Sequence, residues 1–168
     1  MKKYFRIILP FILLISFSGC GIYSFTGMNL SPDIKTFSVK YFPNNAALVQ
    51  PSLSSKFTNA LRDVFNSKTN LSLVASNADL ELEGEITGYS TEPVAITGDQ
   101  KAAMQRLKVT VNVRCTNKKE PNKSFEQSFN HYADYDATKQ LSEVESSLIE
   151  EINEYLVDQI FTKVAVDW

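Results

Sequence analysis

The residues in this sequence with the clearest chemical potential are its two cysteines and its one histidine. Cys20 follows Ser18 and Gly19 at the end of a short apolar run, an arrangement that is typical of a lipobox. The cysteine of a lipobox becomes the first residue of the mature chain and carries lipid. Acyl chains contribute about 0.8 kcal/mol per CH₂ group buried in a bilayer. The predicted chemistry at Cys20 is therefore attachment of a nearly permanent membrane anchor.

The residues before Cys20 have the composition of a signal peptide. The chain starts with three positive charges, at Lys2, Lys3 and Arg6. An apolar run over residues 7–17 follows, and it is too short to span a bilayer as a helix, which takes roughly 20 residues. We expect residues 1–19 to be removed and residues 20–31 to form a lipidated tether. The alternatives are a short N-terminal anchor helix and a secretory signal with ordinary cleavage.

The second possible chemistry is a thiol–imidazole pair of Cys115 and His131, which the pattern puts on neighbouring strands. Cys115 alternates with Val111 and Val113, so it falls on the apolar face, where a cysteine is a small hydrophobe with a raised pKa. The sequence has no HExxH, GxSxG, CxxC or phosphate-binding glycine loop. We therefore expect no enzymatic activity, no cofactor and no metal site.

The predicted mature chain is acidic, because loss of Lys2, Lys3 and Arg6 lowers the formal charge from −2 to −5. Such a chain is a poor general binder of nucleic acid, and a polyanionic ligand needs a local basic patch. The tip of a predicted hairpin holds one candidate set against Glu120, with a net charge of +2: Lys118, Lys119 and Lys123. A predicted strand holds the other set: Arg106, Lys108 and Arg114.

The acidic residues Glu81, Glu83 and Glu85 alternate along the preceding strand and share a sheet face with the strand cations. A strand lacks the curved loop that Ca²⁺ sites use. We expect these carboxylates to pair with the strand cations and to neutralise them.

Apolar periodicity predicts the elements that position these residues. Alternation predicts strands over residues 34–41, 80–89, 106–115 and 125–134, with a further short edge strand possible at 71–74. Helical stripes predict a helix that starts near Pro51 or Ser52 and a long helix that ends near Val164, with Ser142 and Glu145 as a capping box. Residues 91–105 are predicted to be a loop.

The order β-α-β-β-β-α predicts an α+β fold, in which two helices pack on one face of a four-stranded mixed sheet. The predicted single domain covers residues 32–168.

Several segments of the sequence, taken in their order along the chain, resemble the LptE family of lipopolysaccharide-assembly lipoproteins. The first is Gly21-Ile22-Tyr23-Ser24-Phe25-Thr26-Gly27 after the lipobox. The others are residues 57–63, Glu83-Gly84-Glu85-Ile86, Phe129 with residues 132–135, and Ile160-Phe161 to the Trp168 ending. The resemblance covers nearly the whole mature chain. It implies the same fold, two helices on a four-stranded sheet. It also implies that the protein catalyses no covalent chemistry.

The resemblance also implies a role and partners. Family members are outer-membrane lipoproteins that plug the lumen of the LptD β-barrel and help to deliver lipopolysaccharide to the outer leaflet. The six candidate cations above would then meet lipopolysaccharide phosphates, and Val94, Ile96 and Lys101 in the long loop would contact the barrel. Gly21, in place of an inner-membrane retention Asp, indicates sorting to the outer membrane, with the domain facing the periplasm or the barrel lumen. Two alternatives are another periplasmic lipoprotein, as an accessory domain of a secretion or transport complex, and a small hydrolase, against which the missing catalytic motifs argue.

Overall fold

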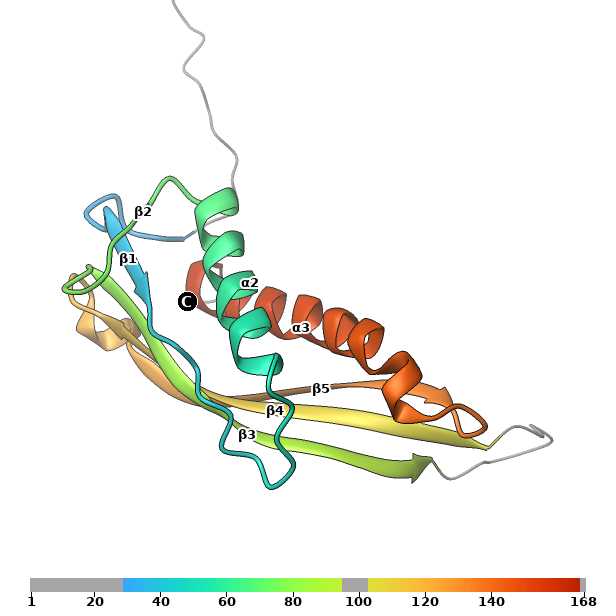
Figure 1. The fold of residues 1–168 in the computed structure, drawn as a ribbon. Helices are drawn as coiled ribbons and strands as arrows, with labels where there is room; N and C mark the ends of the chain where they lie inside the picture. The colour runs from blue at the N-terminus through green and yellow to red at the C-terminus, as the bar shows by residue number, and fades with distance from the viewer. Residues whose placement is uncertain (1–28, 95–102, 167–168) are drawn as a thin grey trace, which may run out of the picture.

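The computed structural model describes residues 29–94 and 103–166, which form one curved sheet with two helices on one of its faces (Figure 1). The strands are β1 (Thr36–Val39), β2 (Ser72–Leu73), β3 (Leu80–Val94), β4 (Met104–Asn117) and β5 (Phe125–Asp136). The helices are α2 (Leu53–Lys68) and α3 (Leu141–Ala165), and a short 3₁₀ turn, η1, covers Pro121–Lys123. The α+β prediction is confirmed, with both helices on the same face.

The sheet has five strands, in the order β2-β1-β3-β4-β5, where the sequence predicted four. The additional strand is the short β2, which pairs in parallel with β1 through Ser72 and Leu73. It lies within residues 71–74, where the sequence indicated a possible short edge strand. β1 is also parallel to β3, while β3, β4 and β5 form an antiparallel meander. A parallel pair needs a crossover, and α2 provides it.

The core lies between the helices and the inner face of the sheet. The inward residues of β4 predicted by alternation, from Leu107 to Cys115, are all fully buried. α2 buries Leu53, Phe57, Leu61 and Phe65 at helical spacing, as its apolar stripe predicted. The Phe65 ring stacks on Phe37 with centroids 5.6 Å apart and meets Phe161 of α3 edge-on at 5.2 Å. These rings join the sheet and both helices in one core.

β3 continues to Val94 and β4 starts at Met104, so the predicted loop over residues 91–105 is shorter than expected. Residues 90–94 lack apolar alternation, but the β4 partner supplies their backbone pairs, from Ser90 with Lys108 to Val94 with Met104. A register shift between Ile86 and Gly88 changes the alternation, and Tyr89 consequently points inward. The strand conformation of residues 90–94 therefore depends on their pairing with β4 and not on their own apolar pattern.

The predicted capping box of α3 is wrong. The helix starts at Leu141, the N-cap position is Gln140, and no side chain caps it. Glu145 instead accepts hydrogen bonds from the Tyr89 hydroxyl and from Nε2 of Gln50. Ser52 does occupy the N-cap position of α2, but its hydroxyl donates to Oε1 of Gln50 and makes no cap. Glu145 is thus engaged by the distant residues Tyr89 and Gln50, and Ser52 by its near neighbour Gln50, so neither side chain caps a helix.

Candidate functional site

The outward face of the sheet carries rows of charged side chains that cross β3, β4 and β5. In one row Arg114 is the register partner of both Glu83 and Glu126. Its Nη1 lies 3.2 Å from Oε1 of Glu83, and its Nε lies 2.9 Å from Oε2 of Glu126. Lys40 Nζ adds a contact of 2.6 Å to Glu83. The hydrogen bond from Lys40 lowers the pKa of Glu83, and the one from Arg114 lowers the pKa of Glu126. This row is therefore fully paired.

A second row is centred on Arg106. Its Nε and Nη2 donate to the two carboxylate oxygens of Asp134 at 2.7 and 2.9 Å, and its guanidinium lies over the Tyr132 ring, 3.6 Å from the centroid. This two-pronged hydrogen bond lowers the pKa of Asp134. Arg106 is thus held by Asp134 of β5. The sequence had predicted that the three glutamates of β3 would pair with it.

Lys108 lies between these rows. Its register partners are Ser90 on β3 and Tyr132 on β5, and its side chain is half-buried. Within residues 29–94 and 103–166 it makes no ion pair. Of the three strand cations predicted to contact an anionic ligand, Lys108 is therefore the one without a carboxylate partner in the part of the chain that the structure describes.

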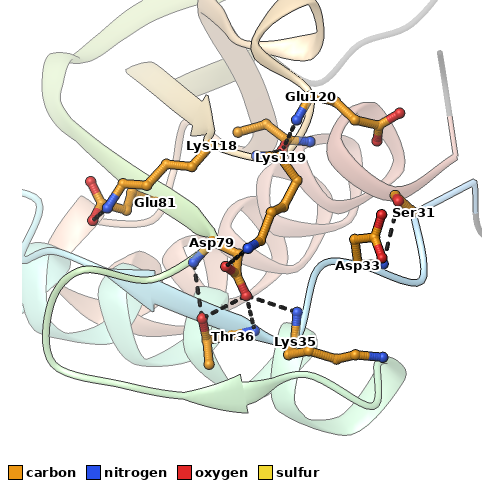
Figure 2. Close-up of polar contacts among 10 residues, drawn as sticks. Ser31, Asp33, Lys35, Thr36, Asp79, Glu81, Lys118, Lys119 and Glu120 are labelled. Carbon is orange, nitrogen blue, oxygen red and sulfur yellow. Dashed lines mark hydrogen bonds and ion pairs between the residues drawn. The ribbon is translucent and has the colours of Figure 1, made fainter.

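The lysines of the hairpin tip are all paired (Figure 2). Lys118 Nζ lies 2.7 Å from Glu81, and Lys119 Nζ lies 3.2 Å from Asp79. Lys123 Nζ lies 3.1 Å from Glu120. The net charge of +2 expected for the tip counted Glu120 alone. The fold adds two carboxylates, those of Glu81 in β3 and of Asp79 in the turn before it. The three lysines therefore face three carboxylates.

Asp79 is the centre of this end of the molecule (Figure 2). Its Oδ2 accepts hydrogen bonds from the backbone N–H of Lys35 at 2.9 Å, and from the N–H and hydroxyl of Thr36 at 3.0 Å. The Lys35 amide holds the pKa of the Asp79 carboxyl well below its usual range. Asp79 thus joins β1, the start of β3 and the hairpin tip, and part of the tip's charge stabilises the fold.

Of the predicted barrel-contact residues, the structure describes only Val94, which lies at the opposite end of β3. Val94 is the last residue of β3 and pairs with Met104. Ile96 and Lys101 lie outside the described residues, as does the predicted lipid-bearing Cys20. Their roles remain predictions.

The structure does not bring Cys115 and His131 together. In the β4–β5 register Cys115 is opposite Phe125, six positions along β5 from His131, which corresponds to roughly 20 Å. Burial raises the pKa of the Cys115 thiol to about 12. His131 instead stacks on Tyr155 with ring centroids 4.4 Å apart. In the described part of the chain, no group of His, Cys, Asp or Glu side chains is arranged to hold a metal ion.

Sequence reasoning missed a groove between α2 and α3. Its volume is about 960 Å³, and Asn153 of α3 lines it. Asn153 is only 5% exposed, and its Oδ1 has no hydrogen-bond partner in the described structure. One indication was available: Asn153 interrupts the apolar stripe of α3 directly after Ile152.

Within the described residues, neither helix is long and apolar enough to cross a membrane.

Comparison with known proteins identifies a family and a fold. Residues 34–164 match the family model described as "LptE: Lipopolysaccharide-assembly". A search of curated proteins finds no match. Among solved structures, a minor lipoprotein from Acinetobacter baumannii is similar, with 14% identity, a TM-score of 0.51, and coverage of 78% of this chain and 92% of that one.

Two further solved structures are similar to this chain. PelC from Paraburkholderia phytofirmans, described as a dodecamer, has 9% identity and a TM-score of 0.50, with coverage of 81% of this chain and 92% of that one. The rare lipoprotein B from Shewanella oneidensis has 11% identity and a TM-score of 0.44, with coverage of 76% and 90%.

Proposed function

This chain belongs to the LptE family of lipopolysaccharide-assembly proteins, and from that membership we propose that it is an outer-membrane lipoprotein that assists an LptD-type β-barrel in lipopolysaccharide assembly. The observation that carries the proposal is the family match over residues 34–164, which spans nearly all of the sheet and both helices. The proposed role is non-enzymatic. It consists of filling the barrel lumen and handling a lipid with clustered phosphates.

The outward face of the sheet supports a position inside a barrel. The interior of outer-membrane barrels is polar, whereas the surface that faces lipid is apolar. The sheet presents Arg114 and Arg106 in paired rows with Glu83, Glu126 and Asp134, so it can lie against a polar wall without leaving these charges unpaired. A face of this kind is unsuited to contact with lipid chains.

The proposed anchor is lipid on Cys20, which holds the domain at the outer membrane facing the periplasm or the barrel lumen. The described chain starts beside the end of α3, where the N–H of Asn29 donates to the carbonyl oxygen of Ala165 at 2.7 Å. We expect Cys20→Ala to abolish incorporation of labelled palmitate and to block processing of the precursor. A Cys20→Ala protein that still incorporates label would disprove the anchor.

Co-purification from detergent extracts tests the barrel partner. A plug is expected to bring down one large barrel protein. An accessory lipoprotein of a secretion or transport complex would instead bring down other components, and an enzyme none of these. The PelC structure, described as a dodecamer, has a similar fold, so fold alone does not distinguish these assemblies.

Photo-crosslinking tests the orientation. Probes at Val94, Ile96 and Lys101 are expected to trap the barrel. Val94 ends β3, and this end of β3 and β4 projects away from the hairpin tip (Figure 1). Glu151, exposed on α3, is the matched control position. Crosslinking from Glu151 alone would show that the orientation is wrong.

Six cations are proposed to contact lipopolysaccharide phosphates. They differ in whether a carboxylate of the domain already pairs with them. Lys118, Lys119 and Lys123 at the tip, and Arg106 and Arg114 on the strands, already have carboxylate partners. Lys108 has none in the described structure and can accept a phosphate without breaking an ion pair. We therefore place the first phosphate contact at Lys108.

A further inference from the structure

Helices α2 and α3 both lie on one face of the sheet (Figure 1). Residues of both helices line the groove, which is therefore on the other side of the core from the outward sheet face. Its apolar lining comes from Ala60 and Val64 of α2 and from Val157 of α3. Tyr155, which is 53% exposed, adds an aromatic ring. A groove of about 960 Å³ is large enough to accept several side chains of a bound polypeptide.

The charged residues of the groove are predominantly acidic. Four carboxylates line it, those of Asp63, Glu150, Glu154 and Asp158, against the ammonium groups of Lys56 and Lys68. Lys68 is paired with Asp158 at 2.9 Å, and Lys56 donates to the Ser146 hydroxyl at 3.1 Å. In the described structure Asp63, Glu150 and Glu154 have no ion pair, so the groove has an unbalanced negative charge.

Asn153 gives an independent indication of a ligand. It lines the groove among these carboxylates, is 95% buried, and leaves its Oδ1 without a donor. A buried carbonyl oxygen without a partner is unfavourable, and native proteins retain few of them. A ligand that donates a hydrogen bond at this position would satisfy the oxygen.

We propose that this groove binds an arginine-bearing segment of a partner protein. A guanidinium carries five N–H donors in a plane, so one group can reach Asn153 Oδ1 and a neighbouring carboxylate such as Glu150 or Glu154. Its apolar stem fits against Val64 and Val157, and its planar head can stack on Tyr155. A lysine offers a point charge and no planar face, so it fits this combination less well.

The chain's own N-terminal segment is a poor occupant, because residues 20–28 carry no positive charge. The groove lies in the helix layer, and the charged rows proposed to face the lumen lie on the opposite side of the sheet. The proposed groove contact therefore uses none of the residues of those rows.

The test uses the full chain, purified in detergent, and two synthetic amphipathic helical peptides. One carries two arginines spaced by one helical turn, and the other carries citrulline, a neutral isostere, at both places. We expect the arginine peptide to bind at least about tenfold more tightly, with an affinity that falls as salt is added. Binding is also expected to shift the side-chain amide signal of Asn153 in NMR spectra.

Variants locate the binding. Glu150→Gln with Glu154→Gln is expected to weaken the arginine peptide by about tenfold. The matched control, Glu143→Gln with Glu151→Gln, removes the same charge from exposed positions of α3 outside the groove and leaves affinity unchanged. Asn153→Leu keeps the side-chain size and is expected to abolish the preference for arginine. The proposal is overturned if neither peptide binds, if both bind equally, or if the control pair weakens binding as much as the groove pair.

Discussion

The hydroxyl of Tyr89 in β3 donates a hydrogen bond to Oε1 of Glu145 in α3 and so ties the sheet to the first turns of the long helix. Tyr89 is only 6% exposed, and it points inward because the register shift between Ile86 and Gly88 changes the strand's alternation. Burial, and then the hydrogen bond to Glu145, raise the pKa of Tyr89 well above its ordinary value of 10.0. A shift in strand register has thus placed a polar group where the helix can use it.

Tyr89→Phe keeps the ring and removes this hydrogen bond. We expect the free energy of unfolding to fall by about 1 kcal/mol, measured by urea denaturation, because Glu145 loses its shortest donor. Tyr155→Phe is the control, since that tyrosine is largely exposed, and it should change stability little.

The same residue gives a pH dependence. Its raised pKa in the folded state means that its contribution to stability is complete below pH 10 and is lost as the pH rises beyond that value. The wild type should therefore lose stability more steeply than Tyr89→Phe above pH 10. Parallel curves at high pH would contradict this account of Tyr89.

Gly84 is predicted to tolerate no side chain. A Cβ atom there would lie 2.0 Å from the backbone oxygen of Asn112 and 2.7 Å from the Phe42 ring. Gly84→Ala must shift the β3–β4 pairing, and we expect a loss of about 1–3 kcal/mol in the free energy of unfolding. Gly88→Ala is the matched control, because the nearest atom to a Cβ there is Cβ of Thr110 at 3.0 Å, so the overlap is smaller and the expected loss is less. Equal losses would show that the Asn112 contact is not the cause.

The regular part of the fold was predictable because alternation and helical stripes report burial directly. Leu107 to Cys115 alternate cleanly, and every inward member is buried. The ends of β3 and β4 were not predictable, because Ser90 and Glu92 belong to a strand only through their pairing with Lys108 and Arg106. The capping box was missed for a related reason, since Glu145 binds Tyr89 across the core.

The charged residues of the candidate site were predictable, but their pairing was predictable only in part: Arg114 does pair with Glu83, as expected. Lys118 and Lys119 are close to Glu120 in sequence, yet their carboxylate partners are Glu81 and Asp79, about forty positions away. Arg106 likewise pairs with Asp134 on the next strand. A count of charges along a hairpin therefore overestimated the free positive charge at the tip.

Asp79 is expected to control the acid stability of the domain. Its depressed pKa means that its contribution is present above its ordinary pKa of 3.8 and is lost as the pH falls below that value. Asp79→Asn should lower the melting temperature at neutral pH, because the carboxylate that accepts from Lys35 and Thr36 is replaced. The difference from wild type should shrink in acid. A difference that stays constant down to pH 2 would rule out the carboxylate charge as its source.

Cys115 is expected to be inert to thiol reagents in the folded protein. It is fully buried, and burial raises the pKa of its thiol to about 12, so little thiolate forms at neutral pH. Labelling should follow unfolding in urea. Cys115→Ser places a hydroxyl in the apolar site and should cost about 1–3 kcal/mol in the free energy of unfolding. Rapid labelling of the native protein would contradict the burial of Cys115.

The last prediction concerns lipopolysaccharide. Among the described residues, Lys108 is the cation of the strand face that makes no ion pair. It lies between Ser90 and Tyr132, and its half-burial limits screening by salt. We expect Lys108→Gln to weaken binding of purified lipopolysaccharide by about tenfold, the loss of one charge-assisted hydrogen bond. Because it breaks no ion pair, its melting temperature should stay close to that of the wild type. Binding is best followed at physiological ionic strength, where the Debye length is about 8 Å.

The tip provides the comparison that decides between the sites. Lys118→Glu with Lys119→Glu sets like charges against Glu81 and Asp79, so it should lower the melting temperature and leave binding of the folded protein nearly unchanged. Arg106→Glu should also destabilise, because it faces Asp134. If the tip variant loses lipopolysaccharide while Lys108→Gln binds normally, the phosphates bind at the tip by displacing its carboxylates, and the assignment to Lys108 is wrong.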